Sequence, residues 1–276
     1  MNRPADLDAS LLGHASTYAE GYDPGLLFAF ERAPLRADLG LGATLPFRGV
    51  DLWTAYELSW LDSAGKPQIA IAKFVVPAES PRLVESKSVK LYLTAMNQAR
   101  FASADELAAT LTRDLSAATG AQVDVSLTLP DGFAALLYAE LAGECLDAEL
   151  LAAVDPEPVP KALAASGPTI TETLFTCLFR SVCPVTGQPD YASVQIAYRG
   201  SRIDHEGLLR YLVSFRRHPG FHEHCVERIF ADVWWRCRPE ELSVYARFTR
   251  RGGIDINPYR TSTPGPLPAH ARTARQ

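Results

Sequence analysis

The sequence predicts an α+β protein that consists of two similar halves, each with antiparallel strands and two helices. Apolar, β-branched and aromatic runs occur in adjacent pairs joined by turn residues, which is typical of hairpins rather than of strand–helix–strand alternation. The order strand, turn, strand, helix, helix, strand occurs twice, with an offset of about 120 residues. That offset is too long for a solenoid repeat and is typical of a duplicated domain.

Four segments carry the prediction in the first half. Residues 51–77 predict a hairpin, because two apolar runs flank the turn sequence DSAGKP. Residues 88–101 place apolar side chains at helical spacing and predict a helix. Residues 103–120 predict a second helix, because they begin with a serine followed three residues later by a glutamate and end in a glycine. Residues 122–130 alternate like a strand.

The second half repeats this order. Residues 169–182 and 191–200 predict two strands joined by a turn that contains Pro and Gly. Residues 204–220 and 221–237 predict two helices separated by a Pro-Gly pair, and residues 242–249 predict a closing strand.

A proline-rich segment separates the halves. Residues 156–168 predict a linker, because prolines and small residues interrupt every periodic pattern there. The first half then covers residues 1–155 and the second half covers residues 169–276.

Bulk composition narrows the functional class. The 276 residues are 47% apolar, which supplies a sizeable core, and the net charge of -5 argues against nucleic-acid binding as the main role. The start of the chain lacks the apolar core of a signal peptide, and no run of about 18 apolar residues occurs. The sequence therefore predicts a cytoplasmic protein without a membrane partner, in which the five cysteines are reduced thiols.

Cys183 and Asp190 lie at the two ends of the turn in RSVCPVTGQPDYASVQIAYRG. A turn requires Gly, Pro and polar residues but no thiol, and reactive groups are often held on loops by a rigid scaffold. If the turn closes a hairpin, Asp190 returns to within reach of Cys183, which is nucleophilic only as a thiolate. A buried structural cysteine and an ordinary strand-entry aspartate remain the alternative. The remaining cysteines lie within apolar patterns and are expected to be structural: Cys145, Cys177, Cys225 and Cys237.

The sequence FHEHCVERIF places His222, Glu223, His224 and Cys225 at the start of a predicted helix. A zinc site with one further cysteine is conceivable. Against it, His222 and His224 are two residues apart on a helix and point to different sides, and no C-x-x-C or H-x-x-x-H spacing occurs. We therefore expect no metal, a structural role for His224, and a Glu223 that at least complements the helix dipole.

Two charged motifs complete the candidates. Glu85, Ser86 and Lys87 precede the first helix, where an ordinary cap and a solvated charged face explain them. Arg251 and Gly252 combine a guanidinium with flexible backbone, which fits a phosphate, although an exposed basic turn fits equally well.

These motifs taken together resemble one family. The segments ESKSVKLYL, CPVTGQPD, LLRYLVSFR, FHEHCVERIF and SVYARFTRRGGIDINP match the pattern of the NADPH-dependent 7-cyano-7-deazaguanine reductases of the queuosine pathway. The length and the segments YDPGLLF and LPFRGVDLWTAYELSWL resemble the long form of that family, and the resemblance runs from about residue 20 to the end.

The resemblance implies a fold, a reaction and a set of site residues. The fold is the tunnelling fold in two tandem units, and the assembly is a homodimer or a larger oligomer. The reaction converts a nitrile to a primary amine with two NADPH, with Cys183 as the nucleophile that forms a thioimidate and Asp190 as the proton donor. Two sets of binding residues are implied. The substrate set is Val84, Glu85, Ser86, His222 and Glu223, and the NADPH set is Ser86, Lys87, Arg251 and Gly252.

Two other functions remain as alternatives. One is a zinc-dependent hydrolase of the same fold, similar to the GTP cyclohydrolases, with Cys183, His222 and Cys225 as ligands. The other is a non-catalytic binding module for purine-like ligands. Neither explains the ESKS and RRGG motifs together.

Overall fold

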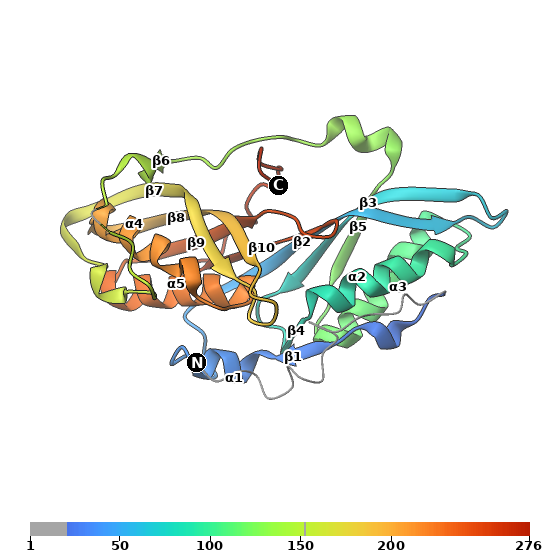
Figure 1. Cartoon of the computed structure of the whole chain (residues 1–276), viewed down its shortest axis with the longest axis horizontal. Coiled ribbons are helices and arrows are strands. Elements are labelled where there is room, and N and C mark those ends of the chain that lie inside the picture. Colours follow the sequence, from blue (N-terminus) through green and yellow to red (C-terminus); the bar gives the residue numbers. More distant parts are fainter. Residues whose placement is uncertain (1–20, 152) are drawn as a thin grey trace. The chain divides into compact units, whose positions relative to one another are not determined.

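The computed structural model describes residues 21–151 and 153–276, which form two compact units (Figure 1). Unit 1 contains residues 21–38, Val50–Leu137 and Arg250–Ile256. Unit 2 contains Leu39–Gly49, Tyr138–Thr249 and Asn257–Gln276. The chain passes between the units several times, so neither unit is one continuous segment of the sequence.

The strands of unit 1 are antiparallel. β2 (Arg48–Leu61) and β3 (Pro67–Pro77) form the predicted hairpin, and β5 (Asp124–Thr128) pairs with the other edge of β3. A separate pair joins β1 (Ala29–Glu31) to β4 (Arg82–Val84). The hairpin at 51–77 and the strand at 122–130 are thereby confirmed.

The helices of unit 1 are α1 (Arg32–Ala37), α2 (Ser86–Ala95) and α3 (Ala104–Thr119). α3 begins and ends as the sequence predicts. The Ser103 hydroxyl accepts a hydrogen bond from the backbone N–H of Glu106 at 3.2 Å, and Gly120 closes the helix in the left-handed conformation, with φ of 75°. The apolar sides of α2 and α3 share one buried core with β2 and β3.

Unit 2 is built around a longer sheet. Its strands run in the order β6-β7-β8-β9-β10, and all neighbours are antiparallel except β6 and β7. Their bounds are β6 (Glu144–Cys145), β7 (Ala165–Val182), β8 (Pro189–Ile203), β9 (Glu241–Phe248) and β10 (Ile254–Thr261). The first three residues of β10 belong to unit 1 and the others to unit 2.

Helices α4 (His205–Val213) and α5 (His222–Cys237) cover one face of this sheet (Figure 1). Alternate residues of β8 and β9, such as Val194, Ile196 and Val244, point toward the helices and form the core of unit 2. Strands joined as hairpins and covered by helices on one face confirm the predicted α+β class.

The prediction that the strand at 242–249 closes the fold is wrong, because β10 follows it and pairs with β9. The sequence IDINPYRT does not show the apolar alternation of a strand, because several of its buried side chains are polar. Arg260 is fully buried, and its guanidinium donates to one carboxylate oxygen of Glu227 on α5 at 2.9 and 3.1 Å. A buried charge that has a partner is compatible with a core strand, although it breaks the apolar pattern.

The remaining elements are short 3₁₀ turns: Pro24–Leu26, Met96–Gln98, Pro130–Ala135, Leu146–Ala148, Pro160–Ala162 and Ser214–Arg217. Within the described ranges, no helix combines the length and the apolar composition that crossing a membrane requires. All five cysteines lie in the described part of the chain and are free thiols. Cys225 and Cys237 are buried as expected, but Cys145 is exposed because it lies on the edge strand β6.

Candidate active site

The β7–β8 hairpin holds the predicted nucleophile. Val182 pairs with Pro189 at the end of the ladder. The backbone N–H of Cys183 then donates to the carbonyl of Gln188 at 2.8 Å, which extends the pairing by one residue. The turn closes through a bond from Gly187 N–H to the Cys183 carbonyl at 3.1 Å. Gly187 has a φ of 67°, a left-handed conformation that favours glycine at this position.

The hairpin brings Cys183 and Asp190 to the same face of the sheet. Asp190 pairs with Ser181, and successive side chains alternate between faces, so residues 181, 183 and 190 share one face. Cys183 is the diagonal neighbour of Asp190, a relation that places Cα atoms about 7–8 Å apart and Cβ atoms somewhat closer. Both side chains are buried, with 7% of Cys183 and 4% of Asp190 exposed.

The start of α5 is tied to the same end of β7. The backbone N–H of Val182 donates to the His218 carbonyl at 3.0 Å, and Gly220 N–H donates to the Val182 carbonyl at 3.1 Å. Gly220 is required by a close approach, since a Cβ there would lie 2.9 Å from the sulfur of Cys225. The segment before α5 therefore runs along the strand end and delivers His222 to the hairpin.

His222 joins the carboxylate on β8 to the end of β9. Its Nε2 lies 3.5 Å from Oδ1 of Asp190. Its ring is stacked on that of Phe248, with the centroids 3.7 Å apart and the planes 2° from parallel. Its Nδ1 is buried and has no hydrogen-bond partner among the residues that the structure describes. Cys183, Asp190 and His222 are thus assembled around one hairpin end.

The neighbours of His222 on α5 are buried as well. Glu223 lies in the first turn with 3% of its surface exposed, and a carboxylate there is stabilised by the helix dipole. His224 is buried, in agreement with its predicted structural role. Burial raises the pKa of the Cys225 thiol to about 12, so this thiol is protonated at neutral pH and is neither a nucleophile nor a ready metal ligand.

In unit 1, Glu85 caps α2. Its two carboxylate oxygens accept the backbone N–H groups of Lys87 at 2.5 Å and Ser88 at 2.7 Å. Burial raises the pKa of Glu85, and the two capping hydrogen bonds oppose that rise in part. The ordinary cap expected from the sequence is confirmed, but the expected solvated face is wrong for Glu85, which is only 1% exposed. Ser86 and Lys87 form the first helical turn, and Val84 ends the buried strand β4 before it.

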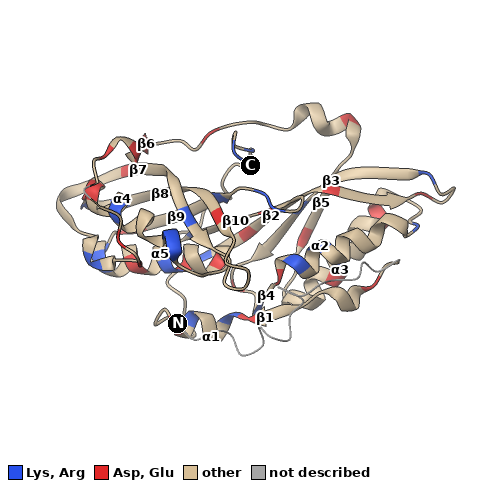
Figure 2. Ribbon diagram, viewed as in Figure 1, with Lys and Arg blue, Asp and Glu red and all other residues tan. Residues whose placement is uncertain are grey.

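The loop between β9 and β10 lies against α2. Gly252 and Gly253 have φ values of 59° and 75°, both left-handed. A Cβ on Gly252 would lie 3.2 Å from Cδ of Lys90, so the loop backbone contacts the α2 side chain closely. The structure therefore brings Arg251 and Gly252 next to the helix that carries Ser86 and Lys87. Blue and red stretches of the ribbon lie next to each other at the start of α2 (Figure 2).

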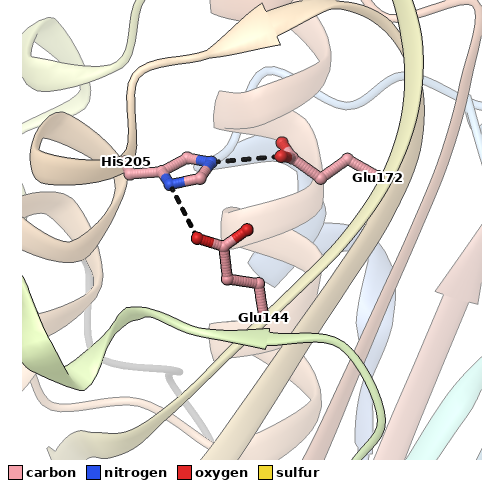
Figure 3. A group of neighbouring side chains, drawn as sticks. All are labelled: Glu144, Glu172 and His205. Atoms are coloured by element: carbon pink, nitrogen blue, oxygen red, sulfur yellow. Dashed lines mark hydrogen bonds and ion pairs between the residues drawn. The ribbon is translucent and has the colours of Figure 1, made fainter.

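The proposed zinc ligands do not assemble. Among the described residues, the group that could hold a metal consists of Glu144, Glu172 and His205, and it includes neither Cys183 nor His222 (Figure 3). His205 Nε2 lies 3.3 Å from Glu172, whereas Nδ1 lies 3.8 Å from Glu144, so each ring nitrogen faces a different carboxylate.

The Glu172 carboxylate also has other partners. Burial raises its pKa, but hydrogen bonds from Tyr198 and His205 outweigh that effect, so its pKa lies below the ordinary value. The guanidinium of Arg202 lies 3.5 Å away. The Glu172 carboxylate thus has a cation beside it and a separate partner for each oxygen. This arrangement is typical of an ion network rather than of a metal centre.

Sequence reasoning missed the partners that hold His222 in place. Phe248, Asn257 and Gln276 form a connected group at the end of β9. No local pattern marks them, because they lie far apart in the sequence and meet only in the folded unit.

Two family models match this chain. Residues 18–127 match the family model described as nitrile reductase, 7-cyano-7-deazaguanine-reductase N-term, and residues 189–265 match the model described as QueF-like protein. A solved structure, the archaeosine synthase QueF-Like in the apo form, has 18% identity and a TM-score of 0.32. The match covers 37% of this chain and 99% of that one.

Curated relatives match almost the whole chain. A relative from Burkholderia multivorans is 55% identical, one from Burkholderia mallei is 57% identical and one from Burkholderia ambifaria is 56% identical. Each alignment covers 97% of this chain and 98% of the relative, and each relative carries the name NADPH-dependent 7-cyano-7-deazaguanine reductase. At this identity and coverage, the chain belongs to the family of the NADPH-dependent 7-cyano-7-deazaguanine reductases.

Proposed function

We propose that this protein reduces the nitrile of 7-cyano-7-deazaguanine to the primary amine of 7-aminomethyl-7-deazaguanine, for queuosine modification of tRNA. The names of its curated relatives support this reaction. The observation that carries the proposal is the buried placement of Cys183 and Asp190 on one face of the β7–β8 hairpin. A nitrile carbon is a poor electrophile, and covalent catalysis divides its reduction into easier steps.

Cys183 supplies the nucleophile. Its sulfur adds to the nitrile carbon while a proton reaches the nitrile nitrogen, which gives a thioimidate, the covalent C–S adduct. After the first reduction the carbon carries an amino group, a hydrogen and the sulfur. Release of the Cys183 thiolate breaks the C–S bond and leaves an imine, which the second reduction converts to the amine.

Asp190 supplies the proton for the nitrile nitrogen. It stands diagonal to Cys183 on the same face, and His222 Nε2 lies 3.5 Å from its Oδ1. A histidine at that distance can return a proton to the carboxylate after each transfer, which the two successive reductions require.

The substrate contacts are Val84, Glu85, Ser86, His222 and Glu223. A deazaguanine presents N–H donors, and a buried carboxylate accepts them well. Glu85 already caps α2: its Oε1 accepts the Lys87 N–H and the Ser86 hydroxyl, whereas Oε2 accepts the Ser88 N–H and has a second lone pair for a substrate N–H. Glu223 offers a second buried carboxylate.

The NADPH contacts are Ser86, Lys87, Arg251 and Gly252. The residues present fit a phosphorylated cofactor, because the left-handed Gly252 backbone lies against the side chain of Lys90, about one turn from the N-terminus of α2, and both Gly252 and that N-terminus adjoin a basic residue. Bound NADPH supplies a hydride in each of the two reductions. Arg251 matches the geometry of a phosphate group, and Lys87 adds a point charge.

We further propose that the α+β architecture consists of tandem tunnelling-fold halves, 1–155 and 169–276, joined by the linker at 156–168. Such units close into a barrel only when several of them associate, so a homodimer is the expected assembly. Sedimentation of the purified protein tests this, and a monomer at micromolar concentration would contradict it.

The decisive experiment for the reaction is the intact mass of the protein mixed with 7-cyano-7-deazaguanine without NADPH. We expect an increase equal to one substrate molecule, lost in Cys183→Ala and retained in Cys145→Ala. Cys145 is the matched control because it is the exposed cysteine that an unspecific reaction would modify first. An adduct that persists in Cys183→Ala would reject the assignment of the nucleophile.

A further inference from the structure

The side chain of Gln276 is buried against the end of β9. Its Nε2 donates hydrogen bonds to the carbonyl of Phe248 at 3.2 Å and to Oδ1 of Asn257 at 2.8 Å. Its Oε1 accepts the backbone N–H of Thr273 at 3.1 Å, which fixes the orientation of the amide. Gln276 and Asn257 are almost fully excluded from solvent. A carboxamide with this many partners is held in one orientation.

The two amides together hold both backbone groups of Phe248. Asn257 Oδ1 accepts the Phe248 N–H at 3.0 Å, and Gln276 takes the Phe248 carbonyl. Phe248 is the last residue of β9, where the regular ladder ends and the loop at 249–253 begins. Without the side chains of Asn257 and Gln276, only the neighbouring residues would hold the Phe248 backbone in place.

The Phe248 side chain is the platform for His222. The rings lie 3.7 Å apart and parallel, so a displacement of the Phe248 backbone moves the imidazole. The imidazole in turn lies 3.5 Å from Asp190. A continuous path of contacts therefore leads from Gln276 through Phe248 and His222 to the proposed proton donor.

We propose that Gln276 is a positioning residue for the reduction, which acts through Phe248 to hold the His222 imidazole beside Asp190. The inference rests on the proposed function and assigns a role in it to residues at the end of β9 and in the segment 270–276. Gln276 does not touch the reacting atoms. It sets the distance over which His222 returns a proton to Asp190, and such transfers are steeply sensitive to distance and alignment.

The segment that carries Gln276 is anchored independently of this path. Ala139 N–H donates to the Arg272 carbonyl at 3.0 Å, Ala274 N–H donates to Glu140 at 2.8 Å, and Arg275 donates to the Cys177 carbonyl at 2.6 Å. These bonds keep the segment in place when the amide of residue 276 is changed. The positioning role is thereby separable from simple attachment of the segment.

The test is Gln276→Glu in the full-length chain. The substitution keeps the size of the side chain but places a carboxylate oxygen against two acceptors, the Phe248 carbonyl and Asn257 Oδ1. The matched control is Gln195→Glu, because Gln195 Nε2 likewise donates to a backbone carbonyl, that of Ala142 at 2.7 Å, without contacting Phe248. Gln276→Met, which is apolar and of similar length, replaces Gln276→Glu if the charged variant does not fold.

The primary readout is kcat for the complete reduction of 7-cyano-7-deazaguanine with NADPH, corrected for the folded fraction, because the return of a proton to Asp190 is needed for repeated transfers and not for the first one. We expect a fall of about tenfold or more in Gln276→Glu at unchanged half-saturating substrate, and less than twofold in Gln195→Glu. In a His222→Ala background, Gln276→Glu is expected to cause no further loss, because the path that it acts through is already broken. A purely structural role would give equal losses in both backgrounds and would overturn the inference.

A second readout does not depend on activity. Stacking on Phe248 shifts the ring proton resonances of His222 upfield, and His222→Ala assigns them. We expect Gln276→Glu to reduce this ring-current shift, and an unchanged shift would overturn the inference. A wild-type protein that forms no adduct would reject the proposed function itself. A normal adduct together with an unchanged kcat in Gln276→Glu would reject only the positioning role.

Discussion

Replacement of Arg260 by Met tests the buried ion pair that holds β10 to α5. The substitution keeps an unbranched apolar stem but removes a guanidinium that is fully buried and donates to Glu227 at 2.9 and 3.1 Å. The Glu227 side chain, itself only 4% exposed, then loses its cationic partner. Removal of one partner from a buried pair destabilises proteins by about 3–5 kcal/mol.

Arg260→Met also removes a cation–π contact, which lowers the stability further. The guanidinium lies 5.7 Å from the centre of the Phe47 ring, and a desolvated cation–π contact contributes about 0.5–2 kcal/mol. The Met side chain recovers part of this by packing on the same ring. We therefore expect Arg260→Met to lower the free energy of unfolding of unit 2 by about 3–5 kcal/mol.

The assay is urea-dependent hydrogen exchange of peptides from β8 and β9, read by mass spectrometry, which reports unit 2 by itself. The matched control is Arg199→Met, because Arg199 is half-exposed and pairs with Glu240 at the surface. Exposed pairs contribute about 0–1 kcal/mol, so we expect little change there.

The double substitution Arg260→Met with Glu227→Met completes the test. It removes the Glu227 carboxylate together with the guanidinium and replaces the pair by apolar side chains, so we expect it to regain most of the loss. A single variant within 1 kcal/mol of the wild type, or a double variant no more stable than Arg260→Met, would refute the reasoning.

Three further predictions concern the candidate site. Asp190→Asn is expected to retain some covalent capture of the nitrile by Cys183 but to lose about 10²–10⁴ in turnover, and unchanged steady-state turnover would remove Asp190 from the mechanism. Glu223→Ala is expected to weaken substrate binding in calorimetry with little change in the capture rate at saturation; normal affinity would place the recognition carboxylate elsewhere. The pKa of Glu85 is raised, so the folded state binds its proton more tightly than the unfolded state. Glu85 therefore contributes stability below about pH 4.5, and this contribution is lost as the pH rises through the pKa of the folded state. Glu85→Gln should therefore abolish this component of the pH dependence in urea unfolding, and parallel curves for both proteins between pH 4 and 7 would contradict it.

Much of the local structure is visible in the sequence because its causes lie within a few residues. Ser103 and Gly120 mark the ends of α3 since the groups they satisfy belong to the same helix. The Pro/Gly-rich turn predicts the hairpin that holds Cys183, because turn residues and strand alternation are both short-range signals. The motifs on these elements also identify the family, which the curated relatives bear out.

Other features depend on residues that are distant in the sequence. The sequence analysis missed β10 because this strand contains a buried charge, that of Arg260. Glu227, 33 residues earlier, stabilises the charge, but a local sequence pattern predicts that a charged residue is exposed. Cys145 appeared structural because its neighbours are apolar, but it lies on a two-residue edge strand and is exposed. In both cases burial is a property of the folded unit and not of the neighbouring sequence.

The sequence by itself determined the α+β class, the two hairpins, the caps of α3 and the family, because each follows from local backbone preferences or from a recognisable motif. Only the tertiary structure decided that His222 stacks on Phe248 beside Asp190, and that Gln276 holds this end of β9. Side-chain contacts across a sheet and a helix require the strands to be in register first. The distances that govern proton transfer are therefore set by packing.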